Sequence, residues 1–201
     1  MKKILLVGGG GYIGTLMMEE YSKNKNISQV NSLDWLIYKS QKINKKLLKN
    51  KKIKFFYGDF RNQKVLEKSM KNVTDIIILA GLVGDPITKK YKILSDKINL
   101  YGIKKLIHKF KDNKKLNKLI FISTCSNYGI VKNKLANEET KLSPKSRYAK
   151  AKVEIEKYIL GLKKKNFSPV VLRFATAFGF SNRMRYDLTI NEFCKEIYNN
   201  K

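Results

Sequence analysis

Short continuous apolar runs alternate along the chain with segments whose apolar residues recur every three or four positions. The runs lie at residues 3–7, 30–33, 53–57, 75–80, 119–123 and 170–174. Such runs are typical of strands buried on both faces of a parallel sheet. Helical spacing follows them at residues 13–21, 65–70, 91–110, 144–165 and 187–198. The alternation predicts an α/β protein, a doubly wound parallel sheet with helices on both faces.

The first strand runs directly into a glycine-rich turn. Gly9, Gly11 and Gly14 give the spacing G-x-G-x-x-G, and Gly8, Gly11 and Gly14 give G-x-x-G-x-x-G. A turn without side chains lets a diphosphate approach the backbone, and the helix that follows offers free N–H groups at its N-terminus. Four consecutive glycines make such a match easy, so the turn by itself also fits a bare tight turn of an α/β protein.

A carboxylate strengthens the interpretation of the glycine turn as a dinucleotide site. Asp34 stands at the end of the second predicted strand, about 20 residues past the turn, as the dinucleotide fingerprint requires. A carboxylate there accepts hydrogen bonds from a ribose 2′-hydroxyl and repels a 2′-phosphate, which favours NAD over NADP. No G-x-x-x-x-G-K-[ST] motif is present, so a P-loop nucleotidase is not supported.

Composition narrows the class of protein further. With 201 residues, 43% of them hydrophobic, the chain can bury one sizeable core. The net charge of +27 comes almost entirely from lysines spread over the whole chain. We interpret them as a solvated surface, including a basic connector at 42–52, and expect no specific nucleic-acid partner. The first apolar run is too short for a signal peptide, and we expect no membrane segment, no metal site and a cytoplasmic location.

Two segments carry residues suited to acid–base chemistry. The fifth predicted strand ends at Thr124, and the following helix carries Tyr148 and Lys152, which lie four residues apart and so share a helical face. An ammonium beside a phenol favours the phenolate, so we expect Lys152 to lower the pKa of Tyr148. The Y-x-x-x-K spacing occurs five times in this lysine-rich chain. Only this pair opens a helix after a strand end that carries Ser and Thr.

Taken together, these features resemble an extended short-chain dehydrogenase/reductase of the NAD-dependent epimerase/dehydratase family, whose members act on nucleotide sugars. The resemblance extends in the correct order over almost the whole chain, and residues 181–188 also resemble a signature of one branch of the group. It rests on residues 8–14, Asp34, 58–60, 79–86, Asn99, 123–129, Tyr148, Lys152 and 172–179.

The resemblance implies an NAD cofactor in a Rossmann fold, a nucleotide-sugar substrate and hydride transfer with Tyr/Lys acid–base catalysis. It also implies a homodimer built on the helices at 91–110 and 144–165. The catalytic residues would be Thr124, which orients a sugar hydroxyl, Tyr148 as the acid/base, and Lys152, which holds the nicotinamide ribose. The cofactor-binding residues would be Gly8, Gly11, Tyr12, Ile13, Gly14, Asp34, Asp59, Phe60, Ala80, Gly81, Leu82, Asn99, Tyr148 and Lys152.

Two departures from the family pattern bear on the activity. Sugar 4,6-dehydratases of this group place Asp-Glu directly after the catalytic Thr, whereas Cys125 and Ser126 stand here, which favours an epimerase or ketoreductase. Family members also continue well beyond the sixth strand. We therefore divide the chain into an NAD-binding domain at 1–178 and the start of a truncated substrate-binding region at 179–201. A truncated NAD-binding protein without catalytic activity, and a basic binding module on a borrowed fold, remain as alternatives.

Overall fold

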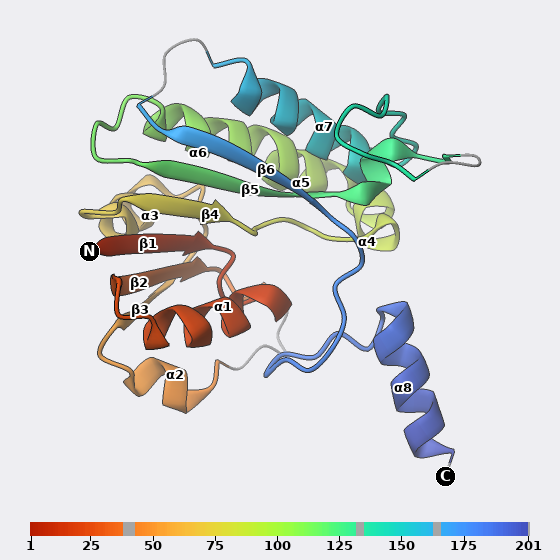
Figure 1. Cartoon of the computed structure of the whole chain (residues 1–201), viewed down its shortest axis with the longest axis horizontal. Helices are drawn as coiled ribbons and strands as arrows, with labels where there is room; N and C mark the ends of the chain where they lie inside the picture. The colour runs from red at the N-terminus through yellow and green to blue at the C-terminus, as the bar shows by residue number, and fades with distance from the viewer. Residues whose placement is uncertain (38–42, 132–134, 163–165, 201) are drawn as a thin grey trace.

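The predicted α/β architecture is confirmed. The computed structural model describes residues 1–37, 43–131, 135–162 and 166–200, and within these ranges six parallel strands form one sheet in the order β3-β2-β1-β4-β5-β6 (Figure 1). The strand order reverses direction at β1 and β4, which creates the switch point of a doubly wound sheet. The strands are β1 (Lys2–Val7), β2 (Ile27–Asp34), β3 (Ile53–Tyr57), β4 (Asp75–Ile78), β5 (Lys118–Thr124) and β6 (Ser168–Phe174).

Helices cover both faces of the sheet because alternate residues of each strand point to opposite sides. On β1, Leu5 and Val7 face a core shared with α3, α6 and α7, whereas Ile4 and Leu6 face a second core shared with α1 and α2. These helices are α1 (Tyr12–Lys23), α2 (Lys45–Lys49), α3 (Gln63–Met70), α6 (Ile103–Phe110) and α7 (Arg147–Leu160). Among the described residues, none of the helices is long and apolar enough to cross a membrane.

The single helix predicted at 91–110 is divided in the structure. It consists of α5 (Lys92–Asp96), a π-helical turn (Lys97–Gly102) and α6, preceded by a short helix α4 (Asp85–Lys90) that was not predicted. A π turn inserts one extra residue into a helix and re-aims a side chain. Here the turn contains Asn99, which is buried and directed at the loop after β4.

Three further boundaries differ from the sequence-based prediction. The helix expected from residue 144 begins at Arg147, because Ser146 caps it by accepting the Ala149 N–H at 3.1 Å, while the N–H of Ser143 donates to the loop carbonyl of Asn127. Its predicted last residues, 163–165, lie outside the described ranges. The connector at 42–52 contains α2, and the last helix, α8, spans Thr189–Asn199 instead of 187–198. Figure 1 shows α8 standing away from the sheet at the end of the chain.

Two glycines of the turn after β1 provide a test of its backbone packing. Gly8 has φ +89°, and a Cβ there would lie 2.6 Å from the Ala80 backbone nitrogen, whereas the nearest atom to a Cβ at Gly11 is 3.2 Å away. We expect Gly8→Ala to lower the free energy of unfolding by about 2–5 kcal/mol, from strain and overpacking together. Gly11→Ala should cost less than about 1 kcal/mol. Urea denaturation of both variants measures the difference, and equal losses would contradict this packing.

Candidate functional site

The carboxyl ends of the strands open onto one cleft of about 590 Å³, a size common for small-molecule sites. The glycine turn and the Tyr148–Lys152 pair both line it, so the two predicted halves of the site meet at the carboxyl edge of the sheet. Fourteen of the predicted site residues line this cleft, and only Asn99 does not. They are Gly8, Gly11, Tyr12, Ile13, Gly14, Asp34, Asp59, Phe60, Ala80, Gly81, Leu82, Thr124, Tyr148 and Lys152.

The glycine turn brings the N-terminus of α1 to the floor of the cleft. Gly11 is the N-cap of α1, and a Cβ built there would lie 3.2 Å from the Gly8 carbonyl oxygen. The first N–H groups of a helix have no acceptor within the helix. Those of Tyr12 and Ile13, which line the cleft, are therefore placed to bind an anionic group.

Asp34 ties the end of β2 to the glycine turn. Its Oδ2 accepts the Gly10 N–H at 2.9 Å, and its Oδ1 accepts the Leu36 N–H at 2.8 Å. Burial raises the pKa of this carboxyl, while the two backbone donors and the charge of Arg183 act in the opposite direction. The neighbouring Trp35 also lines the cleft. The carboxylate is thus held rigidly at the end of the site where the fingerprint places an adenosine ribose.

Asn99 supports the site from behind. Its Oδ1 accepts the Leu82 N–H at 2.8 Å and its Nδ2 donates to the Leu82 carbonyl at 2.9 Å. Gly81, at φ +157°, approaches the same amide, because a Cβ there would lie 3.0 Å from its Oδ1. Asn99 therefore fixes the loop after β4, whose residues line the cleft, and does not itself face the cleft.

At the opposite end of the cleft, Lys152 lies beneath Tyr148 and is 5% exposed. Its Nζ donates to the Ile122 carbonyl at 2.7 Å and lies 5.5 Å from the centroid of the Tyr148 ring. Burial lowers the pKa of Lys152 to about 8, against the opposing charge of Glu156. Burial also raises the pKa of Tyr148 to about 12. The predicted lowering of the Tyr148 pKa by Lys152 is not found, since desolvation dominates at both groups.

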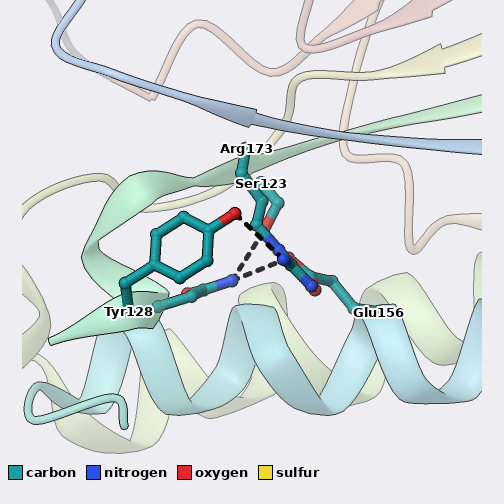
Figure 2. Close-up of polar contacts among 5 residues, drawn as sticks. Ser123, Tyr128, Glu156 and Arg173 are labelled. Atoms are coloured by element: carbon teal, nitrogen blue, oxygen red, sulfur yellow. Dashed lines mark hydrogen bonds and ion pairs between the residues drawn. The ribbon is translucent and has the colours of Figure 1, made fainter. Parts of the chain in front are cut away.

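A polar cluster around the buried Glu156 joins β5, the 3-10 turn that follows it, α7 and β6 (Figure 2). Glu156, one helical turn after Lys152, accepts hydrogen bonds from Ser123 of β5 and from Asn127 Nδ2 at 2.7 Å. Its Oε2 also pairs with Arg173 of β6, at 2.8 Å from Nη2. The cluster fixes α7 against the ends of β5 and β6. It thereby sets the position of Tyr148 relative to Thr124 at the end of β5.

The sequence reasoning assigned no role to several residues that line the cleft. Arg183 and Arg185 enter the cleft from the segment that follows β6. The charge of Arg185 partly opposes the rise in the pKa of Tyr148 that burial causes. The resemblance of residues 181–188 to a family signature was the one signal that pointed to this segment. Cys125 and Ser126, which follow Thr124 in a 3-10 turn (Cys125–Tyr128), line the cleft as well.

The sheet order, the glycine turn and the cleft at the carboxyl edge define a Rossmann-type α/β protein. Residues 4–200 match the model of the NAD dependent epimerase/dehydratase family, and the chain belongs to this family. The resemblance inferred from the sequence is thus confirmed, and NAD is the cofactor of the family.

Individual relatives include both epimerases and a dehydratase. The chain is 28% identical to a dTDP-D-glucose 4,6-dehydratase of Dictyostelium discoideum, over 100% of this chain and 49% of the relative. It is 27% identical to a UDP-glucose 4-epimerase of Lactobacillus helveticus, over 77% of this chain and 45% of the relative. The structure of UDP-glucuronic acid 4-epimerase from Bacillus cereus with UDP-glucuronic acid and NAD superposes with a TM-score of 0.86. That match is 26% identical and covers 99% of this chain and 64% of the neighbour. The chain spans about half the length of these curated relatives.

Removing one partner of the buried ion pair tests the role of the polar cluster. Glu156→Gln leaves Arg173 without its counter-charge, and we expect the free energy of unfolding to fall by about 3 kcal/mol. Glu154→Gln is the matched control on the same helix, because Glu154 pairs with Lys104 at the surface and should change stability by less than about 1 kcal/mol. Chemical denaturation measures both variants. Equal, small effects would show that the cluster does not anchor α7.

The lowered pKa of Lys152 makes stability depend on pH in a defined direction. Between its folded value of about 8 and its ordinary value of 10.5, the unfolded chain holds a proton that the folded chain has released. The contribution of Lys152 to stability therefore rises with pH across this window. We expect Lys152→Met to be more stable than the wild type below pH 8, and this advantage to shrink toward pH 10.5. Denaturation series of the two proteins measure it, and a constant difference would contradict the lowered pKa.

Proposed function

We propose that this chain is an NAD-dependent oxidoreductase or epimerase that acts on a nucleotide sugar by hydride transfer with Tyr/Lys acid–base catalysis. The observation that carries the proposal is the single cleft lined both by the glycine turn with Asp34 and by Tyr148 with Lys152. One end suits the adenosine half of a dinucleotide and the other end suits proton transfer, so a ligand that spans the cleft connects the two.

The residues present fit an NAD cofactor. The glycine turn and the N-terminus of α1, both of which line the cleft, suit a diphosphate. Asp34 would bind the adenosine ribose, Asp59 and Phe60 would flank the adenine, and Lys152 would hold the nicotinamide ribose. When bound, NAD supplies the group that accepts and returns a hydride.

Tyr148 and Lys152 divide the acid–base work. With a pKa of about 12, the Tyr148 hydroxyl keeps its proton at neutral pH and is ready to donate it. To act as a base, the phenol needs a nearby cation, and Lys152 beneath its ring is protonated below about pH 8. Thr124, whose Oγ1 accepts the Ser126 N–H at 3.2 Å, would orient the reacting sugar oxygen.

The reaction class within the family follows from the residues after Thr124. Elimination of water needs an additional acid and base, whereas Cys125 and Ser126 occupy this part of the cleft. We therefore favour epimerase or ketoreductase chemistry over dehydratase chemistry. Binding of NAD without turnover is the alternative, because the chain spans only part of the length of its relatives.

The remaining partner assignments follow the same proposal. The cation Arg185, which lines the cleft and acts electrostatically on Tyr148, suits the phosphates of a nucleotide sugar. The helices of the 91–110 segment and α7 expose Ile93, Tyr101 and Leu160, apolar surface that a homodimer would cover. Free thiols at Cys125 and Cys194 suit a reducing, cytoplasmic location.

The decisive experiment compares binding with turnover. Purified chain is tested with NAD against UDP-, GDP- and dTDP-sugars, and product formation is followed by chromatography. We expect Tyr148→Phe to reduce turnover about 10²- to 10⁴-fold, because it removes the proton donor, while NAD binding stays within a few-fold of the wild type. Tyr198→Phe, the same change at an exposed tyrosine of α8, is the control. Equal turnover in the wild type and Tyr148→Phe would contradict the assigned role, and NAD binding without any turnover would support the inactive alternative.

A further inference from the structure

The segment that follows β6 returns to the glycine turn at the other end of the chain. Ser181 Oγ donates to the Tyr12 carbonyl at 2.8 Å and shares a hydrogen bond with Thr15 Oγ1 at 3.2 Å. The Tyr12 hydroxyl donates to the Gly179 carbonyl at 2.5 Å. The side chains of Ser181, Thr15 and Tyr12 are buried. Residues 179–181 are therefore hydrogen-bonded to the first turn of α1. Figure 1 shows the chain passing from β6 through this segment toward α8.

Asn191 of α8 completes the attachment. Its Oδ1 accepts the Gly179 N–H at 2.9 Å, and its Nδ2 donates to the Tyr12 hydroxyl at 3.1 Å and to the Arg185 carbonyl at 3.0 Å. The side chain is 5% exposed. Both ends of the segment 179–185 are thus held by one buried amide, which gives the residues between them a defined place beside the glycine turn.

This attachment brings Arg183 onto the turn. Its N–H donates to Ser181 Oγ at 3.2 Å, and its Nη1 lies 3.4 Å from the Gly10 carbonyl oxygen. The same Nη1 would lie 3.9 Å from a Cβ at Gly11. Arg183 also lines the cleft, and its positive charge acts to lower the pKa of the Asp34 carboxyl. The guanidinium therefore lies against the glycine turn, and its charge acts on the carboxyl of Asp34.

The charge at this position has a clear consequence for an anionic ligand. A helix N-terminus offers only about half an elementary charge, and the ionised Asp34 beside it opposes the approach of a diphosphate. An arginine offsets that repulsion and forms charge-assisted, often bidentate, hydrogen bonds with phosphate oxygens.

We propose that Arg183 binds the diphosphate of an adenine dinucleotide, so that the segment 179–185 forms a wall of the dinucleotide site opposite the glycine turn. The inference rests on the proposed binding of NAD and adds a residue from outside the domain at 1–178. Residues 179–185 would then bind the cofactor and not the substrate alone.

The test uses a series of ligands that differ in their phosphates. Adenosine, AMP, ADP, ADP-ribose and NAD are titrated into the full chain, with the fluorescence of Trp35, the single tryptophan of the sequence, as the reporter at the cleft. We expect Arg183→Gln to weaken ADP, ADP-ribose and NAD about 10- to 100-fold, as expected for loss of hydrogen bonds to a charged group. Adenosine binding should change less than about threefold. Arg183→Lys should lie between the wild type and Arg183→Gln, because it keeps the charge and loses the bidentate fork.

Controls separate this role from the alternatives. Arg147→Gln removes the same charge at a residue that pairs with Asp96 and is expected to leave every affinity unchanged. An equal loss for adenosine and ADP-ribose in Arg183→Gln would indicate a purely structural role, and unchanged affinity for ADP-ribose would refute the contact. NADP is titrated as an additional ligand, and a loss of affinity confined to NADP would assign the guanidinium to a 2′-phosphate and overturn the proposal. Failure of the wild type to bind any of the ligands would refute the proposed cofactor itself.

Discussion

The site depends on backbone packed directly against backbone at the glycine turn. Without a Cβ, Gly8 lies against the backbone of Ala80 in the loop after β4, and Gly14 of α1 lies against Gly9. These contacts draw the N-terminus of α1 down to the carboxyl edge of the sheet, at the switch point between β1 and β4. Every other part of the site is placed relative to this helix end. Asp34 bonds to the turn from one side, and the segment after β6 bonds to Tyr12 from the other.

The opposite end of the cleft is organised by buried charge. The Nζ of Lys152 donates to a main-chain carbonyl of β5, while Glu156, one turn away, is neutralised by Arg173 of β6. Buried pairs of this kind add little net stability compared with apolar packing, but breaking one is costly. They therefore restrict how α7 can sit on β5 and β6. That restriction fixes the start of α7 relative to the end of β5, so that Tyr148 and Thr124 line the same cleft.

Most of the fold could be predicted from the sequence because it depends on local patterns. Apolar runs marked the parallel strands, and the order of strand, glycines and helix marked the turn. The π turn at Lys97–Gly102 escaped prediction because the apolar spacing across 91–110 stays close to that of a continuous helix. The start of α7 was misplaced because Pro144 suits a helix start as well as the loop in which it lies, and Ser146 is the residue that caps the helix.

Features of the site that depend on distant contacts could not be predicted. The pKa of Tyr148 is set by burial, which the spacing of Tyr148 and Lys152 does not reveal. Arg183 reaches Gly10 across 173 residues of sequence, and no local pattern connects them.

The distribution of charge at the cleft could not be predicted from local patterns either. The lysines that dominate the net charge of +27 are spread over the chain, and salt screens exposed charges beyond roughly 8–10 Å. A phosphate in the cleft therefore responds mainly to the few cations that line it, Arg183 at the glycine turn and Lys152 and Arg185 around Tyr148. The basic composition attracts anions in general, whereas these three side chains determine where in the cleft a negative charge can settle.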